Sequence, residues 1–160
     1  FIQSMDLVSR KLGQGGGANT QAFLTDIQSF INENKDTPEL SGAIKHLQAA
    51  HEAVATSVAQ LTGWFKGGKL EHIPLAAEPF LRIMSELAVG WLLLDQASIA
   101  LRKLPETSET HPDRAFYTGK KFSALYFANN VLSTLPSRVQ HLSAIDTLPV
   151  EIPDEAFAAA

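Results

Sequence analysis

A stripe of regularly spaced apolar residues between positions 40 and 65 constrains this chain most. Its members recur at alternating steps of four and three: Leu40, Ile44, Leu47, His51, Val54, Val58, Leu61 and Phe65. This spacing places side chains on one face of a long helix and favours packing against neighbouring helices. Thr37 as N-cap and Pro38 in the first turn are expected to open that helix. We expect His51 to be a core imidazole hydrogen-bonded to a neighbouring helix.

Most of the remaining chain has helical periodicity too. A short helix is expected over residues 2–12, ended by Gly13, and another runs from Asn19 to the turn at 35–38. After Gly67 and Gly68 comes a helix with little polar face, which we expect to be the best buried, either at the centre of the bundle or covered by a second protein surface; its apolar residues include Leu81, Met84, Leu87, Ala88, Trp91, Leu92 and Leu94.

The last third of the chain predicts two more helices. The first starts at Pro112 and Asp113 and carries these apolar residues: Phe116, Phe122, Leu125, Tyr126, Val131 and Leu132. The second, shorter helix follows Pro136 and contains Val139, Leu142 and Ile145. The tail, 148–160, is expected to be irregular and held down by Ile152 and Phe157.

Together these patterns predict an all-α fold. No stretch of strand length alternates polar and apolar residues, so a sheet is not supported. We therefore expect a four-to-five helix up-and-down bundle, with an extra N-terminal helix and an irregular C-terminal tail. The glycine-rich stretch 13–18 is predicted to be a hinge between residues 1–12 and a bundle of residues 19–160.

Composition excludes several classes of function. The 160 residues carry 13 basic and 17 acidic side chains, a formal charge of -4, so there is no basic excess to bind nucleic acid. With no cysteine, thiolate metal sites and Cys nucleophiles are excluded. The longest apolar run, 87–94, is short of the roughly 20 residues that span a bilayer, so we expect no membrane span.

No sequence motif gives a strong indication of a metal site or a nucleotide-binding site. His51 and Glu52 are followed by Ala55 where a zinc-protease helix needs its second histidine, so no metal site is expected. Residues 13–18 match the letters of a dinucleotide fingerprint, but a helix precedes them where a strand is required, and we interpret them as a linker. His111-Pro112-Asp113 is interpreted as the start of a helix, and Arg82 is expected to pair with Glu86 on the surface.

Three stretches carry a family resemblance. They are IQSMDLVSRKL at 2–12 followed by GGGAN at 15–19, then AFYTGKK at 115–121 with YFANNVL at 126–132, and finally IPDEAF at 152–157. Together they resemble the C-terminal helical domain of bacterial acyl-CoA dehydrogenases, the methylthiopropanoyl-CoA dehydrogenase-like group. The resemblance spans the chain in order. It implies that residues 1–12 end the dehydrogenase's catalytic helical region and that residues 19–160 form the extra bundle.

The resemblance also implies an activity for the intact enzyme. Such enzymes use FAD to oxidise an acyl-CoA to the trans-2-enoyl-CoA, as in fatty acid β-oxidation, and pass electrons to an electron-transfer flavoprotein. Their catalytic Glu lies in a loop that would precede Phe1, so the chain is expected to be an inactive part of a longer cytoplasmic protein, with a structural and homodimer-forming role.

Two residues are candidates for ligand contacts under that resemblance. Gln3 would lie near FAD and the catalytic loop, and Arg10 would bind the CoA nucleotide, because a guanidinium can take phosphate in two hydrogen bonds or stack on adenine. For Arg10, a solvated side chain near a helix C-terminus is the alternative. For the chain, the alternative is a free-standing helical interaction module whose stripe at 40–65 takes a partner helix in a groove.

Overall fold

The structure is a computed structural model that describes residues 1–158. Its described residues form helices and turns with no strand, which confirms the all-α prediction. The helices are α1 (Ile2–Asp6), α2 (Ala18–Asn34), α3 (Ser41–Lys66), α4 (His72–Lys103), α5 (Pro112–Asn130), α6 (Leu135–Ser143) and α7 (Leu148–Glu151).

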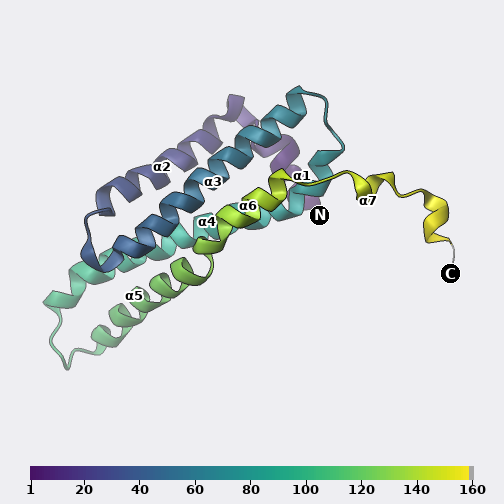
Figure 1. The fold of residues 1–160 in the computed structure, drawn as a ribbon. Coiled ribbons are helices and arrows are strands. Elements are labelled where there is room, and N and C mark those ends of the chain that lie inside the picture. The colour runs from purple at the N-terminus through teal and green to yellow at the C-terminus, as the bar shows by residue number, and fades with distance from the viewer. Residues whose placement is uncertain (159–160) are drawn as a thin grey trace.

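The long helices run up and down the length of the molecule (Figure 1). Helices α2, α3 and α4 alternate in direction, and α5 and α6 together form the fourth rod, running back along α4 and then α3. A 3-10 turn at Leu132–Thr134 separates α5 from α6, and Pro136 in the first turn of α6 has no N–H with which to continue the helix of α5. Helix α1 packs against α4 at the end of the bundle.

The stripe on α3 forms much of the core. Leu40, Leu47, Val54 and Leu61 are fully buried, and Ile44 is nearly so. The stripe is therefore largely covered by the chain's own helices α2, α4 and α6, contrary to the interaction-module alternative, which needs the stripe open to a partner helix.

The far end of α3 differs from the prediction. Phe65 is 38% exposed, and the neighbouring Trp64 takes the buried position instead, with its ring centroid 5.0 Å from that of His72. The start of α3 also differs: Thr37 makes no side-chain cap bond, because a short 3-10 turn, Pro38–Leu40, comes between it and the helix.

Helix α4 is central but is buried on one face only. Its core face presents Phe80, Ile83, Leu87, Gly90 and Leu94 to the other helices, which agrees with the prediction of a well-buried helix. Leu92, which the sequence placed inside, is 50% exposed. Helix α4 with the turn that follows it, residues 72–106, is long and apolar enough to cross a membrane by length and composition alone, a criterion that core helices of water-soluble bundles also meet.

Three aromatic residues of α5 point outward, whereas Phe127 packs against the core. Phe116, Phe122 and Tyr126 are 60%, 62% and 69% exposed. Small residues take the inner face instead: Ala124 and Ala128 are buried against neighbouring helices. Because alanine lets helix backbones approach closely, the bulky side chains of α5 are left on the solvent side.

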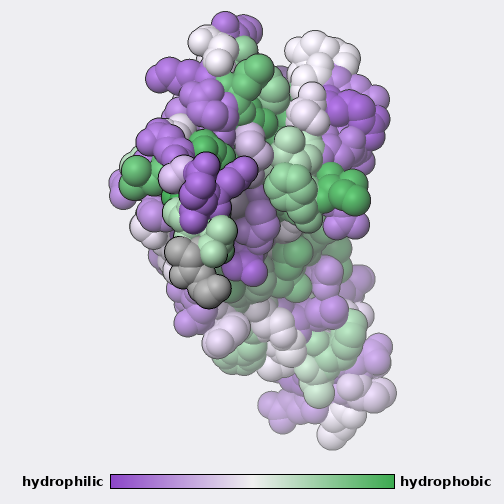
Figure 2. All heavy atoms as spheres, turned by 90° about the vertical axis from the view of Figure 1, so that its right-hand side faces the viewer, coloured by the Kyte–Doolittle hydropathy of each residue, from purple (hydrophilic) through white to green (hydrophobic). Residues whose placement is uncertain are grey.

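The C-terminal tail projects from the end of the bundle (Figure 1). It forms α7 and a 3-10 turn at Asp154–Phe157, and every residue from 148 to 158 is exposed. Ile152 and Phe157 are 46% and 71% exposed, so the expectation that they hold the tail down is wrong. Seen from this end, hydrophobic and hydrophilic residues are interleaved on the surface (Figure 2). Positions 159 and 160 of the predicted tail lie outside the described residues.

The glycine stretch is a defined turn. Gly15, Gly16 and Gly17 have φ of 62°, 69° and 87°, the left-handed region that side chains disfavour. The turn follows a helical segment and leads into α2, which fits the linker interpretation and not a nucleotide-binding loop that follows a strand. The domain boundary drawn there from the sequence stays a prediction.

Candidate functional site

The segment before the glycine turn holds both residues singled out for ligand contact. Helix α1 continues into a π-helical turn, Leu7–Lys11, which widens the helix at this point. Val8 and Leu12 fix the segment to the bundle, since they are 2% and 8% exposed. Thr20 of α2 donates its hydroxyl to the carbonyl of Leu12 at 3.2 Å and holds the end of the segment in place.

Arg10 projects from this segment with its guanidinium held by Asp6. Its Nε and one terminal nitrogen donate to the two carboxylate oxygens at 2.6 and 2.9 Å, a bidentate pair one helical turn apart. The hydrogen bond from Arg10 lowers the pKa of Asp6, and the same bond raises the pKa of Arg10. The Arg10 side chain is 63% exposed in the last turn of the helical segment, so it is solvated while Asp6 restrains its guanidinium. The Asp6–Arg10 spacing of four was a signal that the sequence analysis missed.

Gln3 lies on the exposed surface of α1. Its side-chain amide makes no hydrogen bond within residues 1–158, so its donors and acceptor are available. Beside it, Phe1 and Ile2 are 80% and 85% exposed. The structure thus brings Arg10 together with Asp6, while Gln3 belongs to an apolar, uncovered end of the same segment.

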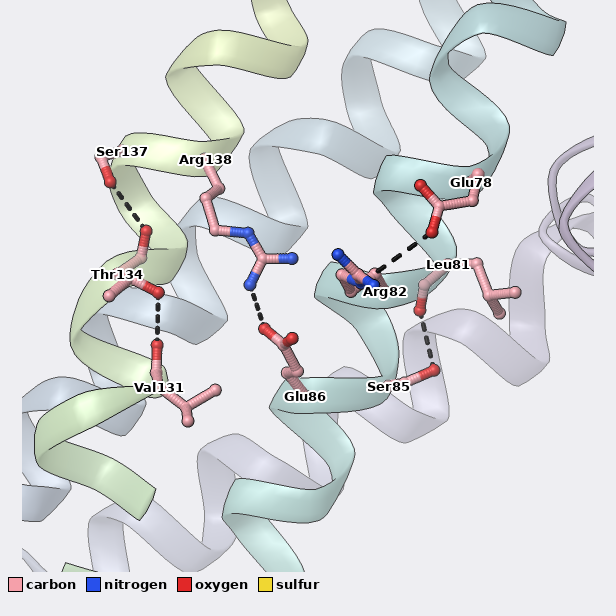
Figure 3. Close-up of polar contacts among 9 residues, drawn as sticks. All are labelled: Glu78, Leu81, Arg82, Ser85, Glu86, Val131, Thr134, Ser137 and Arg138. Carbon is pink, nitrogen blue, oxygen red and sulfur yellow. Dashed lines mark hydrogen bonds and ion pairs between the residues drawn. The ribbon is translucent and has the colours of Figure 1, made fainter. Parts of the chain in front are cut away.

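A second group of charges joins α4 to α6 (Figure 3). Arg138 of α6 donates a hydrogen bond to the carboxylate of Glu86 on α4. Arg82 instead faces Glu78, with 3.9 Å between Arg82 Nε and Glu78 Oε1. The expected Arg82–Glu86 pair is wrong, because Glu86 turns toward the half-buried Arg138 across the helix interface. Each arginine has a carboxylate partner, so this cluster joins two helices and offers no unbalanced charge to a ligand.

Two histidines have the structural roles that the sequence predicted. His51 Nε2 lies 2.9 Å from the carbonyl oxygen of Leu24 on α2; a carbonyl only accepts, so Nε2 carries the proton. Its Nδ1 is buried with no partner in the part of the chain that the structure describes. His111 precedes α5, and its Nδ1 accepts the N–H of Asp113 at 3.2 Å, the cap expected at this helix start.

No metal centre is formed by the described residues. Within 1–158, no three His, Asp or Glu side chains gather where they could hold an ion. The N-terminal segment combines an arginine oriented by Asp6 and an exposed glutamine with the uncovered apolar residues Phe1 and Ile2.

These features define a class of protein, an antiparallel helical bundle. A charged N-terminal segment packs on the end of the bundle and presents an arginine to solvent. The family model described as acetyl-CoA dehydrogenase C-terminal like matches residues 23–153. The chain belongs to this acyl-CoA dehydrogenase C-terminal-like family, as the resemblance in the sequence indicated.

Curated relatives agree with the family. A butyryl-CoA dehydrogenase of Syntrophomonas wolfei subsp. wolfei is 30% identical over 157 residues, which cover 98% of this chain and 25% of that protein. A second butyryl-CoA dehydrogenase of the same organism is 29% identical over an equal share. The broad-specificity linear acyl-CoA dehydrogenase FadE5 of Mycobacterium tuberculosis is 29% identical, covering 98% of this chain and 26% of that protein. The chain spans about a quarter of the length of these relatives.

Proposed function

We propose that this chain is the C-terminal helical part of an FAD-dependent acyl-CoA dehydrogenase, and that its own role is structural. The observation that carries the proposal is that the relatives match 98% of the chain along a quarter of their own length. The exposed Phe1 and Ile2 support it, since apolar side chains open to water favour packing against a further protein surface. In the intact enzyme the reaction converts an acyl-CoA to the trans-2-enoyl-CoA, and an electron-transfer flavoprotein accepts the electrons.

Within that enzyme, Arg10 is proposed to contact the CoA nucleotide. Asp6 uses two of the five N–H donors of the guanidinium and fixes its plane, which leaves three donors and both flat faces available. A fixed plane favours stacking on adenine and directs the remaining donors at a phosphate. Lys11 Nζ also lies 3.9 Å from the Asp6 carboxylate, so Asp6, Arg10 and Lys11 together keep a net positive charge, and both orientation and attraction would contribute to this contact.

FAD supplies the hydride acceptor in this family. Among the described residues only Gln3 is proposed to approach it, and its free amide fits a hydrogen bond to a flavin edge or to the catalytic loop. A single exposed amide does not form a flavin pocket, so the cofactor is proposed to be held mainly by the portion of the enzyme that this chain does not include. The homodimer and the cytoplasmic location are likewise proposals.

The test is the kinetics of Arg10→Ala in the full-length protein. We expect KM for butyryl-CoA to rise about tenfold with kcat unchanged, because the contact is made equally in the ground and transition states. A substrate lacking the 3'-phosphate separates the two modes: a smaller KM ratio indicates phosphate binding, and an equal ratio indicates stacking. Lys11→Ala, which removes the neighbouring exposed charge, is the control. Unchanged KM values in Arg10→Ala would remove the CoA role while leaving the dehydrogenase assignment to a separate assay of flavin reduction.

A further inference from the structure

Two exposed surfaces at opposite ends of the bundle have complementary chemistry. One is the C-terminal arm, residues 146–157, whose apolar Leu148, Val150, Ile152 and Phe157 are 62%, 52%, 46% and 71% exposed. The other is the aromatic face of α5, formed by Phe116, Phe122 and Tyr126, which are exposed to a similar degree. Each presents large apolar groups to water, and burying them would be favourable.

The charges of the two surfaces are opposite. The arm contains four carboxylates and no basic residue: Asp146, Glu151, Asp154 and Glu155. Helix α5 carries Arg114, Lys120 and Lys121 against a single acid, Asp113, in a chain that is acidic overall. None of these three cations pairs with a carboxylate in the described part of the chain.

The lysines of α5 lie on the same surface as the aromatic rings. Lys120 Nζ lies 5.2 Å from the ring centroid of Phe116, and Lys121 Nζ lies 5.8 Å from that of Phe122. Lys120 is directed by a 2.7 Å bond to Gln96 of α4. The aromatic face is thus a set of apolar rings bordered by cations, which suits an apolar segment bordered by carboxylates.

We propose that the C-terminal arm of one copy of this chain packs on the aromatic face of α5 of a second copy. The arm leaves the bundle at the C-terminal end of α6 and points away from its own α5 (Figure 1), which favours an intermolecular contact. In a two-fold pair, each arm would bind the partner's α5, so two contacts form in one association. Pro149 and Pro153 restrict the arm before it binds and reduce the entropy lost on ordering.

This inference deepens the homodimer that forms part of the proposed function. Its first test places the photo-crosslinking residue benzoylphenylalanine at Phe157 of the full-length protein and mixes heavy-isotope and normal copies. We expect crosslinks to the tryptic peptide 122–138 or to 115–120, joining a heavy and a normal peptide. The same probe at Leu70, exposed in the turn before α4, is the control and should not label α5.

Other crosslinks would overturn the proposal. Products joining only peptides of the same isotope would show that the arm folds back within one copy. Products with a peptide from outside these 160 residues would show that the remainder of the enzyme covers the arm.

Charge reversal gives a second, independent test. Lys120→Glu with Lys121→Glu should weaken the dimer at least about tenfold in sedimentation equilibrium at low salt, since attraction to the arm becomes repulsion. Adding Asp154→Lys and Glu155→Lys should restore most of the affinity. The matched control, Lys66→Glu with Lys69→Glu, makes the same change of net charge in the α3–α4 turn; an equal loss there, or no rescue, would contradict the pairing.

Flavin reduction by butyryl-CoA separates this inference from the proposed function. If the crosslinks fail in a protein whose flavin is still reduced, the arm contact is wrong and the dehydrogenase proposal stands. If the crosslinks form but acyl-CoA does not reduce flavin, the contact stands and the proposed function fails.

Discussion

The side chain of Leu132 fills the space beside the backbone of Gly90, where the junction between α5 and α6 meets α4. A Cβ atom at Gly90 would lie 2.5 and 2.7 Å from the two methyl carbons of Leu132, which is fully buried. Gly90 therefore permits the close packing that places the α5–α6 junction on α4.

Gly90→Ala is expected to destabilise the fold. Overpacking a core costs about 1–3 kcal/mol, and the better helix propensity of alanine returns about 1 kcal/mol, so a net loss of about 1 kcal/mol is expected. Gly63→Ala is the matched control, because a Cβ there meets nothing within 4 Å; it should stabilise by about 0.5–1 kcal/mol. Urea unfolding measures both. Equal effects of the two variants would show that Leu132 moves aside without cost.

Removing His51 should loosen the contact between α2 and α3. His51→Ala deletes the hydrogen bond to the Leu24 carbonyl and part of the packing, for an expected loss of about 1–2 kcal/mol in the free energy of unfolding. His46→Ala is the control and should lower the free energy of unfolding by less. His46 is on the same helix and is also half-buried, but its side chain makes no hydrogen bond in the described structure. Chemical denaturation of the pair of variants gives the comparison.

The Arg138–Glu86 pair should couple α6 to α4 measurably. Both side chains are about one-quarter to one-third exposed, so screening is incomplete and a double-mutant cycle of Glu86→Gln and Arg138→Met should give a coupling of about 0.5–1.5 kcal/mol. The same cycle at Glu78 and Arg82, which are 63% and 66% exposed and 3.9 Å apart, should give nearly none. A coupling that is equal for both pairs would mean that the helix interface adds nothing to the first.

The Asp6–Arg10 pair should persist over the whole pH range in which proteins are usually studied. Because Arg10 lowers the pKa of Asp6 below its ordinary 3.8, the folded form binds this proton less readily than the unfolded form. The contribution of the pair is therefore fully present above pH 4 and is lost only as the pH falls through the lowered pKa. In Arg10→Ala, a carbon-13 NMR titration of the Asp6 carboxylate should show its pKa moving up toward 3.8. No upward shift would show that the bidentate pair does not form in solution.

The sequence alone predicted the helices and the buried stripe of α3 because both depend on periodicity. Residues from Leu40 to Leu61 repeat with the period of a helix, and a helix of that length with one apolar face must bury it against others. The start of α5 at His111 and Pro112 was also predictable, since its cap uses residues adjacent in the chain. The residues alone also indicated the acyl-CoA dehydrogenase resemblance along the chain, and the family match confirms it.

The sequence analysis identified Arg10 but not the partner that orients it. Its identity suggested a ligand contact, but its partner Asp6 was overlooked although the spacing of four was present. Its availability could not be read from residues, because it depends on Val8 and Leu12 fixing the segment so that Arg10 stays on the outside. The ligand roles of Arg10 and Gln3 stay predictions.

What the sequence by itself determined is where helices form and where most of them begin and end, because those depend on neighbours within a few residues. On α5, tertiary packing decided which face of the helix is buried. Small residues, Gly90 on α4 with Ala124 and Ala128 on α5, let the helices approach closely, so the rings of Phe116, Phe122 and Tyr126 were left outside although they carry the larger apolar surface. The choice of Arg138 as partner for Glu86 has the same origin, because residues 52 apart meet only after the rods have packed.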